Sequence, residues 1–561
     1  MTDAVFNLAI VVLIGAVFGV IAKIFKQPTI LAYLATGIFI GAVGLFQVGG
    51  NETFKSFSEL GIMFLLFLVG MEINYSSLRL VGRASLFVGL GQVLVTFFAG
   101  YFLAHWFGFA VLPALYIAIA LTFSSTVIVV KLLSDKSDLN SLYGKISVGL
   151  LLVQDFIVIL ILVLLTGIQA GQAISVIGIV FTILKGAILF ALMLYLGRKV
   201  LQYILGKVAR SHELLFLVSL AWVFLVAAVV SKMGFSVEIA GFLAGLALAN
   251  SSEHHQISAR IKPLRDFFLI AFFVVLGAEV VFSNLRGLFL PVITFSFFVL
   301  LIKPLIIFIF MGLMGYRKRT GFMTGITMAQ ISEFSLVLIV LGLQLGHVDE
   351  RVVALVTAVG VISILFSSYM IQFSEKMYVV LSRALFIFER KKNIERDMKI
   401  TDEKRPIVLI GFHRLGESIA MGLTKGKLLV VEFDPEIIKK LKHGGYHYLF
   451  GDISDPEIFE SAKVQDAELV ISTSPNIEDN ILLLIEIRGF EHRPKVVVRA
   501  ETEHEVEMLY KEGADYVLFP HLTSGQYFGK TIAIDSEMKI LEQLKTKDLA
   551  LLRSISLKGE F

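Results

Sequence analysis

A single acidic residue, Asp155, lies inside a long apolar stretch of the sequence. Residues 148–163 read VGLLLVQDFIVILILV, and Gln154 is the only other strongly polar residue among them. An apolar run of this length predicts a helix that spans a membrane. Placing a carboxylate near its centre costs roughly 2.5–3.5 kcal/mol on insertion scales. Because such a cost is usually retained for function, the sequence predicts that Asp155 binds or moves a charged species.

Two further charged residues lie near the middle of apolar stretches. Lys303 is in FSFFVLLIKPLIIFIF and Glu333 is in GITMAQISEFSLVLIVLG. A buried lysine and a buried acid offset each other's desolvation when they are close in space. The alternative is that they pair with each other or with backbone and only fix helix packing. Lys185 is another such residue, but its apolar stretch is too long to fix its depth.

Two of the apolar stretches look interrupted by small polar residues. Such residues at mid-membrane can cap broken helices, whose free backbone groups and dipole ends coordinate ions. The alternative is that the hydroxyls bond back to their own helix or aid packing. The first interruption contains Thr122, Ser124, Ser125 and Thr126, and the second contains Gly325, Thr327, Gln330 and Ser332.

The composition places these stretches in a membrane protein. The chain has 561 residues, of which 56% are hydrophobic and only 17% charged, and its mean hydropathy is +0.82. It contains no Cys, which excludes disulfides and thiolate metal sites, and its net charge of +4 is too small to predict nucleic-acid binding. The apolar runs predict about thirteen spans: 4–22, 28–46, 57–73, 84–104, 111–133, 144–167, 173–206, 213–233, 236–251, 263–282, 286–314, 320–346 and 350–373.

The charges between the spans predict how the chain is oriented. Lys and Arg are concentrated in alternate loops, such as those with Arg79 and Arg83 or with Arg317 and Lys318. Since cytoplasmic loops carry the excess of basic residues, the N-terminus is expected outside and the C-terminal part in the cytoplasm. The two interrupted spans, the fifth and the twelfth, are seven apart. This odd offset predicts inverted repeats with a central site between two broken helices.

The composition changes after about residue 388. We expect a membrane domain over 1–388, a charged linker over 389–404, a soluble domain over 405–522 and a tail over 523–561. The soluble part alternates short β-like runs, such as PIVLIGF and KLLVVEF, with helical stretches. That alternation predicts a parallel α/β sheet.

The first turn of this soluble domain resembles a nucleotide-binding loop. It reads Gly411-Phe-His413-Arg414-Leu415-Gly416, and the next strand ends near Glu432 and Asp434. A phosphate would lie at the helix N-terminus and an acid would hold the ribose hydroxyls. His413 stands where the second glycine of the fingerprint belongs, which favours weak dinucleotide binding or a smaller nucleotide such as AMP. The alternative is a Rossmann lobe that only dimerises.

The set of membrane motifs resembles the Kef-type branch of the monovalent cation:proton antiporter superfamily. The matching pieces are LLVQD, SSTVIVVKLL, LLFLVGMEI at 65–73, AGFLAGLALANS at 240–251, Lys303 and AQISEF at 329–334. The resemblance implies a homodimer with a panel domain and a mobile core that carries two crossed broken helices. It implies that Asp155 binds the cation and the proton in turn, beside Gln154, Thr126 and Ser125. Lys303 and Glu333 would then compensate charge.

The soluble domain is similar to the RCK (regulator of potassium conductance) N-lobe. LFGDISDPEIF at 449–459 matches its third strand, with Gly451 and Asp452 near the adenosine, and Arg414 fits a phosphate contact. The resemblance implies a regulatory nucleotide, AMP or NAD(H), and leaves room for an ancillary regulatory subunit. No covalent cofactor is expected, and nothing in the domain resembles a catalytic site.

We therefore expect a membrane all-α protein with a cytoplasmic α/β domain that exchanges potassium for protons across the cell (inner) membrane. Asp155 would hold the metal ion, K⁺ or Na⁺. Because Gln154 replaces the second acid of sodium-selective relatives, the resemblance favours potassium. The alternatives are a sodium–proton antiporter, a nucleotide-gated cation channel, against which the lack of a TVGYG-like filter argues, and an oxidoreductase.

Overall fold

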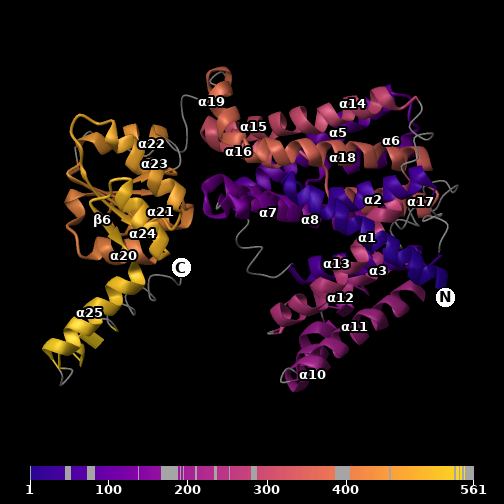
Figure 1. The fold of residues 1–561 in the computed structure, drawn as a ribbon, viewed down its shortest axis with the longest axis horizontal. Helices are drawn as coiled ribbons and strands as arrows, with labels where there is room; N and C mark the ends of the chain where they lie inside the picture. The colour runs from indigo at the N-terminus through magenta and orange to yellow at the C-terminus, as the bar shows by residue number, and fades with distance from the viewer. Residues whose placement is uncertain are drawn as a thin grey trace. The chain divides into compact units, whose positions relative to one another are not determined.

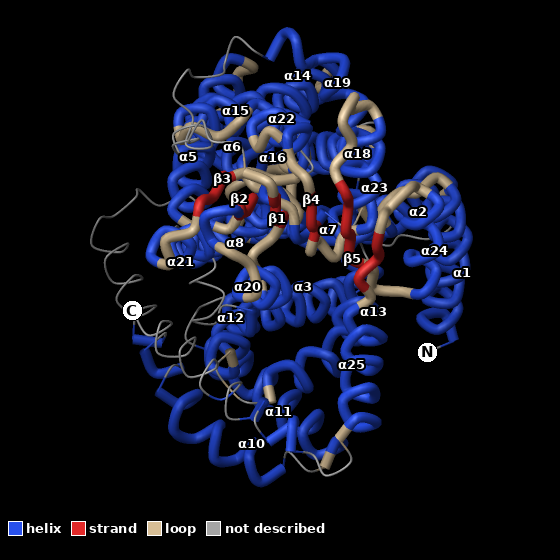
Figure 2. The backbone as a smooth tube through the Cα atoms, turned by 90° about the vertical axis from the view of Figure 1, so that its left-hand side faces the viewer, coloured by secondary structure: helices blue, strands red, loops and turns tan. Residues whose placement is uncertain are grey.

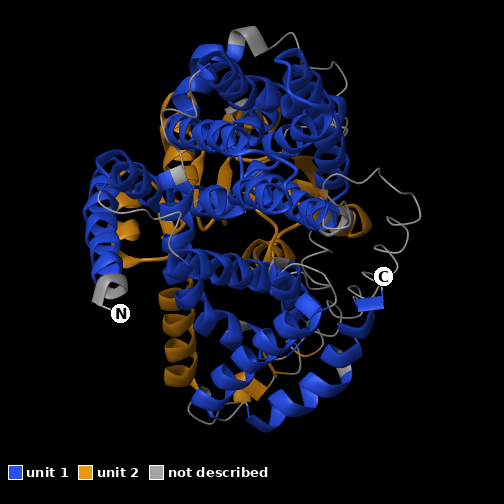
Figure 3. Ribbon diagram, turned by 90° about the vertical axis from the view of Figure 1, so that its right-hand side faces the viewer, with its two compact units in different colours: residues 1–391 blue, residues 392–561 orange. Residues whose placement is uncertain are grey.

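The computed structural model describes most of both predicted parts of the chain. The described residues are 2–44, 52–72, 82–136, 138–165, 188–208 apart from 190 and 194, 211–232, 237–279 apart from 250 and 252, 287–385, 405–453, 456–535, 539–542, 544, 545 and 549. The chain forms two compact units, Met1–Lys391 and Lys392–Phe561 (Figure 3). Lys185 and half of the predicted span 173–206 lie outside the described residues.

The first unit is entirely helical in its described part. Eight of its described helices are long and apolar enough to cross a membrane, and three shorter apolar helices accompany them. The predicted ranges other than 173–206 fall on described helices, and both predicted interruptions are real breaks, so the predicted membrane all-α fold is confirmed. Figure 1 shows these helices as two groups.

The panel group is centred on α3 (Glu52–Glu72), which contacts α12 (Val237–Leu248) and α13 (His254–Glu279), and its other helices pack on these or on one another. Glycines allow this close approach. A Cβ on Gly245 would overlap the carbonyl of Phe67, and one on Gly241 would overlap that of Met63. Small residues at such interfaces are typical of helices that associate in lipid. The other members are α1 (Thr2–Ile24), α2 (Thr29–Val43), η2 (Gly197–Leu201), α10 (Gln202–Val208) and α11 (His212–Lys232).

The crossing group contains the two broken helices and the helices around them (Figure 1). The first broken helix is α6 (Val111–Thr122) followed by α7 (Thr126–Asp135), and the second is α16 (Lys318–Thr327) followed by α17 (Glu333–Gln344). The others are α5 (Arg83–Trp106), η1 (Asp138–Asn140), α8 (Leu142–Leu165), α14 (Phe289–Phe297), η3 (Phe298–Ile302), α15 (Lys303–Leu313) and α18 (Glu350–Gln372).

The helix α19 (Ser374–Leu385) ends the described part of the first unit and is bonded to the crossing group. Arg319 forms an ion pair with Glu375 at 2.7 Å. Lys136 Nζ donates to the Ser374 hydroxyl at 3.1 Å. These contacts join α19 to the ends of α7 and α16 that lie away from the breaks.

The second unit is a parallel α/β sheet, which confirms the predicted Rossmann-like domain (Figure 2). Its strand order is β3-β2-β1-β4-β5-β6, and all pairs are parallel. Val408, Val430 and Val470, one from each central strand, are completely buried. The strands are β1 (Ile407–Ile410), β2 (Leu428–Glu432), β3 (His447–Phe450), β4 (Leu469–Ser472), β5 (Lys495–Arg499) and β6 (Tyr516–Leu518).

The strand order reverses direction at β1, so the gap between the carboxyl ends of β1 and β4 is where a ligand is expected. Right-handed crossovers place the helices after β1 and β2 on the opposite face from those after β4 and β5. The helical segments of this unit are α20 (Arg414–Met421), η5 (Lys425–Lys427), α21 (Pro435–His443), α22 (Pro456–Ser461), η6 (Val464–Asp466), α23 (Ile477–Arg488), α24 (Glu503–Lys511) and α25 (Pro520–Ile534).

Candidate functional site

The break between α6 and α7 brings Asp155 into contact with the start of a half-helix. Asp155 lies on α8 and is 7% exposed. The Thr126 hydroxyl, on the first residue of α7, donates to Asp155 Oδ2 at 2.9 Å. Since a helix N-terminus carries partial positive charge, this position favours a carboxylate. Ser125 caps α7 by accepting from the Ile128 N–H at 3.2 Å.

Gln154 is bonded within the same break. Its Oε1 accepts from the Ser124 N–H at 2.9 Å, and its Nε2 donates to Gln92 Oε1 at 2.6 Å. Both glutamines are completely buried. The Gln154 side chain therefore supports the backbone of the break beside Asp155.

The two broken helices meet at a crossing that contains Lys303. Its Nζ donates to the Phe123 carbonyl at 2.8 Å, in the first break, and to the Gln330 carbonyl at 2.9 Å, in the second. The Ser124 hydroxyl also reaches from the first break to the second and donates to the Met328 carbonyl at 3.1 Å. Lys303 thus pairs with backbone, one of the alternatives that the sequence left open.

The second break is held mainly by hydroxyl groups. Ser332 caps α17, with its hydroxyl accepting from the Phe334 N–H at 3.1 Å. On α18, Ser367 donates to Gln330 Oε1 at 2.8 Å, and Ser363 accepts from the Ile331 N–H at 3.3 Å. Glu333 opens α17, is 4% exposed, and interacts with the Ser125 side chain of the first break.

The crossing thus gathers Asp155, Gln154, Thr126, Ser125, Lys303 and Glu333 in one region of the membrane unit. Most of the polar atoms gathered here are oxygens of a carboxylate, of hydroxyls and of backbone carbonyls, which are the groups that replace the hydration shell of a monovalent cation. Val127, next to Thr126, is 47% exposed and Phe156, next to Asp155, is 46% exposed. The carboxylate therefore lies just beneath the surface of this unit. Among the described residues, no three His, Cys, Asp or Glu side chains gather as a transition-metal site.

Several residues of the crossing are not among those predicted from the sequence. Gln92 on α5 and Ser363 and Ser367 on α18 are buried polar residues in otherwise apolar spans. Ser147 on α8 is another, and its hydroxyl lies 2.9 Å from that of Thr327. The signal that could have found Gln92 is the same one that found Asp155, a strongly polar side chain at mid-span.

In the second unit, the connection from β1 into α20 requires two glycines, one in the loop and one in the first turn of the helix. Gly411 has φ +85°, which a side chain tolerates poorly, and a Cβ on Gly416 would overlap the Gly411 carbonyl. His413 instead has φ −69° and ψ −169°, so its backbone does not need glycine, and its side chain is exposed. His413 makes no side-chain cap bond to α20. Arg414 is exposed and Leu415 half-buried at the start of this helix.

Glu432, at the end of β2, is bonded to backbone and is only 3% exposed. Its Oε2 accepts from the Phe412 N–H at 2.7 Å, and its Oε1 accepts from the N–H groups of Phe433 and Asp434 at 2.8 and 3.0 Å. The carboxylate thereby fixes the glycine loop to the end of β2. Asp434 is half-buried two residues later and is the acid nearer the surface.

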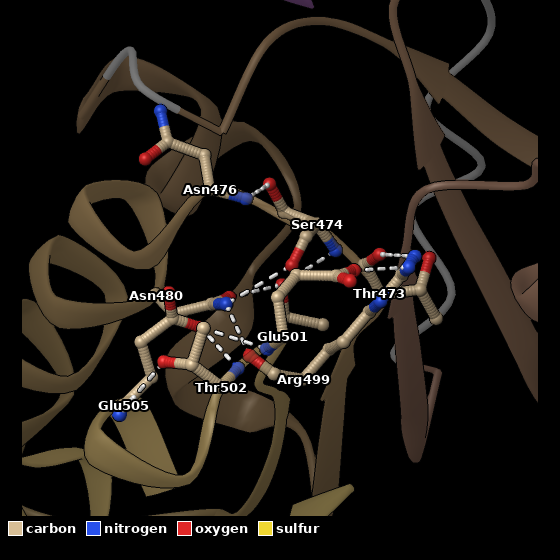
Figure 4. A network of polar contacts seen from close by, with 9 residues as sticks. Thr473, Ser474, Asn476, Asn480, Arg499, Glu501, Thr502 and Glu505 are labelled. Atoms are coloured by element: carbon tan, nitrogen blue, oxygen red, sulfur yellow. Dashed lines mark hydrogen bonds and ion pairs between the residues drawn. The ribbon is translucent and has the colours of Figure 1, made fainter. Parts of the chain in front are cut away.

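The remaining predicted nucleotide residues follow β3. A Cβ on Gly451 would overlap Ile458, and Asp452 is 7% exposed. At the neighbouring strand ends, Arg499 donates to the Thr473 carbonyl at 3.4 Å and forms an ion pair with Glu501 (Figure 4). The sequence reasoning did not select Arg499, which adds a guanidinium to the carboxyl edge of the sheet.

Comparison with known proteins agrees with this architecture. Residues 9–374 match the family described as sodium/hydrogen exchanger, transmembrane, and residues 407–520 match the TrkA-N domain. The chain is 26% identical over 517 residues to the "Putative cation/proton antiporter YbaL" of Escherichia coli (strain K12), covering 90% of this chain and 92% of that one. It is 25% identical over 515 residues to the "Putative K(+) efflux antiporter KefB" of Alkalimonas amylolytica, covering 89% and 76%.

The membrane fold is also known from a solved structure. The sodium proton antiporter MjNhaP1 from Methanocaldococcus jannaschii aligns with 67% of this chain and 98% of its own, with a TM-score of 0.53 and 16% identity. The apolar helices and these relatives make the chain an integral membrane protein. The family match covers most of the chain and includes both helix breaks, Asp155 and Lys303, so the chain belongs to the transmembrane sodium/hydrogen exchanger family and carries a TrkA-N domain behind its membrane unit.

Proposed function

We propose that this protein exchanges potassium for protons by alternating access, with Asp155 as the group that binds each in turn. A single carboxylate held in an apolar medium is neutralised by a proton or by a monovalent cation. Because the two compete for the same oxygens, their movements in opposite directions are coupled. The observation that carries this proposal is the buried Asp155 carboxylate, bonded at 2.9 Å to the Thr126 hydroxyl at the start of a broken half-helix.

Potassium is the proposed substrate for two reasons. Gln154, next to Asp155, bears no charge, and its amide oxygen accepts from the Ser124 N–H, so one carboxylate is available per cycle. The relative KefB is named a putative K(+) efflux antiporter. Sodium is the second candidate, since MjNhaP1 is titled a sodium proton antiporter. Lys303 and Glu333 complete the site by compensating charge at the crossing.

We propose that the second unit regulates exchange by binding a nucleotide, AMP or NAD(H), at the β1–α20 loop. The positive φ of Gly411 and the close approach of Gly416 to the Gly411 carbonyl shape this loop as a phosphate cradle would require. The nucleotide phosphate would contact Arg414 at the start of α20. The ribose would contact Asp434, and the base would lie near Asp452. The exposed His413 side chain favours the smaller AMP.

The proposed assembly is a homodimer in the cell (inner) membrane. The N-terminus lies outside and the TrkA-N domain in the cytoplasm, as the distribution of basic loops favours. Membrane lipids surround the apolar exposed faces, on which Phe6, Leu13 and Val20 of α1 lie. Crosslinking of the purified protein in lipid tests the dimer, and accessibility labelling of single cysteines in this Cys-free chain tests the orientation.

Proteoliposome flux tests the antiport directly. We expect an outward K⁺ gradient to drive proton uptake through the full chain, and Asp155→Asn to abolish it while expression and melting temperature stay unchanged. Asp349→Asn is the matched control, because Asp349 caps α18 by accepting from Val352 N–H at 3.0 Å, and Asn caps equally well. Normal exchange by Asp155→Asn would refute the site.

The same vesicles separate the alternatives. Comparing K⁺, Rb⁺ and Na⁺ at one ionic strength identifies the transported cation. A higher kcat/KM for Na⁺ than for K⁺ would show that sodium is the substrate. A channel would pass cations without an opposing proton flux, and the current would follow the membrane potential. Electroneutral, proton-coupled flux would exclude it.

Calorimetric titration of the full chain with AMP and with NAD⁺ tests the regulatory site. Gly416→Ala should eliminate binding, because its Cβ would overlap the Gly411 carbonyl. Gly422→Ala is the control: it lies at the end of the same helix, and its Cβ would meet only an ordinary contact at 3.5 Å from the Ile419 carbonyl. Equal binding by both variants would contradict the assignment.

A further inference from the structure

We propose that Gln92 is a positioning residue of the cation/proton site, acting through Gln154 on the backbone that carries Thr126. This inference rests on the proposed function of Asp155. Gln92 lies on α5, outside both broken helices, and is completely buried. Its Nε2 donates to the Thr122 carbonyl and to the Thr96 hydroxyl, both at 3.0 Å, and its Oε1 accepts from Gln154 Nε2 at 2.6 Å.

The two glutamines form one continuous relay across the first break. It runs from the Ser124 N–H to Gln154 Oε1, from Gln154 Nε2 to Gln92 Oε1, and from Gln92 Nε2 to the Thr122 carbonyl. Thr122 is the last residue of α6, and Ser124 lies two residues before α7 begins. Two side-chain amides thus replace the helical hydrogen bonds that the break removes.

The ends of the relay fix the orientation of both amides. The Ser124 N–H can only donate, so Gln154 must present its oxygen there. The Thr122 carbonyl can only accept, so Gln92 must present its nitrogen there. The remaining nitrogen of Gln154 then meets the remaining oxygen of Gln92. No other arrangement of the two amides satisfies both backbone groups without leaving a polar group unbonded in an apolar medium.

The relay lies directly beside the proposed ion site. Gln154 precedes Asp155 on α8, and Ser124 precedes Thr126 by two residues. The bonds Gln154–Ser124 and Asp155–Thr126 are therefore two adjacent links between α8 and the break. Gln92 anchors the first link from the opposite side, and α5 is packed closely on α8, since a Cβ on Gly89 would lie 3.0 Å from Val153. A fixed support of this kind holds the site geometry.

The relay also explains why position 154 bears an amide in this chain. A carboxylate at position 154 would accept from the Ser124 N–H but could not donate to Gln92. Gln92 would then have to turn its nitrogen toward position 154 and abandon the Thr122 carbonyl. Gln92 and Gln154 are thus a matched pair, and Gln92 contributes to keeping Asp155 the single acid of the site.

Kinetics of K⁺-driven proton flux in proteoliposomes test this role. We expect Gln92→Leu to raise the KM for K⁺ by about tenfold or more and to shift the pH profile of exchange, as loss of about 1.4 kcal/mol would. Gln92→Asn, which keeps the amide but is too short to join both partners, should show the same shifts with wild-type expression. Thr96→Val is the control, because it removes the Gln92 contact that is outside the relay and should leave KM within twofold.

A double variant makes the test specific. If the glutamines act as one relay, Gln92→Leu/Gln154→Leu should have the same KM as Gln154→Leu alone, because the second substitution has no further link to remove. Unchanged KM and pH profile in both Gln92 variants, or fully additive effects in the double variant, would overturn the inference. Absence of exchange in the wild-type protein, or its persistence in Asp155→Asn, would instead refute the proposed function.

Discussion

The two helix breaks take equivalent places in the membrane unit, seven predicted spans apart, but different chemistry holds them. The first is supported by amide side chains from α5 and α8, Gln92 and Gln154. Each break has its own serine cap, Ser125 or Ser332, but the neighbouring helix α18 supports the second break with the hydroxyls of Ser363 and Ser367. A glutamine both donates and accepts at two separate atoms, whereas a serine hydroxyl offers one rotatable oxygen.

This difference leads us to expect different roles for the two breaks. The first break carries Thr126 and faces Asp155, so in the proposed mechanism its backbone would keep one geometry while the carboxylate exchanges a proton for a cation. In the second break, Glu333 interacts with Ser125, and the Gln330 carbonyl accepts from Lys303. We therefore expect changes to the groups that support the first break to alter exchange, and changes to the hydroxyl groups that support the second break to alter chiefly stability.

The largest effect is expected from Lys303→Met, because Lys303 Nζ is bonded to both breaks. Two buried carbonyls, Phe123 and Gln330, would lose their donor, at a cost on the order of 3 kcal/mol of folding stability or more. Exchange should fall below the detection limit, and the melting temperature in detergent should drop. Lys232→Met, the same change at an exposed residue of α11, serves as the control. A melting temperature equal to that of wild type would contradict the role of Lys303.

A smaller and more selective effect is expected from Thr126→Val. The variant removes the hydroxyl that donates to Asp155 Oδ2 and keeps the shape of the side chain. A hydrogen bond to a charged group contributes about 1.5–3 kcal/mol, so the KM for K⁺ should rise by roughly tenfold or more. Thr126→Ser keeps the hydroxyl and should retain a near-normal KM. Equal KM values for Thr126→Val and Thr126→Ser would show that the Thr126 hydroxyl does not contribute to cation binding.

Effects of moderate size are expected from removing the two helix caps, and the two variants can be compared as a pair. Ser125→Ala and Ser332→Ala each remove an N-cap and should each cost about 1 kcal/mol of stability. Ser125 also interacts with Glu333, so its loss should lower exchange several-fold, while Ser332→Ala should leave the rate per folded molecule near that of wild type. Equal rates in the two variants would show that the breaks do not differ in this way.

The smallest effect is expected from Ser367→Ala. It removes one neutral hydrogen bond, from the hydroxyl to Gln330 Oε1, worth about 1 kcal/mol. The melting temperature should fall slightly and the KM for K⁺ should stay within twofold. A large rise in KM would mean that the second break contributes directly to the ion site, and the contrast between the breaks would be lost.

Much of this architecture could be predicted from sequence because burial in a membrane leaves a strong signal. Asp155, Lys303 and Glu333 stand out as charges in apolar runs, and the clusters around Ser124 and Gln330 mark where helices break. The α/β alternation after residue 405 likewise predicts a parallel sheet, which the structure contains.

The bonding partners could not be predicted in the same way. Lys303 contacts carbonyls 180 and 27 residues away, and no local pattern encodes which backbone groups a break releases. Gln92 was overlooked because a lone amide in a span is a weaker signal than a charge. At Glu432 the sequence correctly marks an acid at a strand end, but only the fold shows that its oxygens accept from three backbone N–H groups.

The two hydrogen bonds of Lys303, one to each break, affect how the membrane unit can change shape. Pulling α6 away from α16 would strip its amine from carbonyls that no water could solvate, so the two interrupted helices resist being drawn apart. Between the crossing group and the panel group, hydrogen bonds of the described residues instead join helix ends: the Tyr369 hydroxyl and Gln372 Nε2, at the end of α18, donate to the carbonyls of Phe25 and Lys26 in the turn after α1. In the proposed mechanism, the ion site would therefore move together with the crossing group, and the change of shape would occur at the border between the two helix groups.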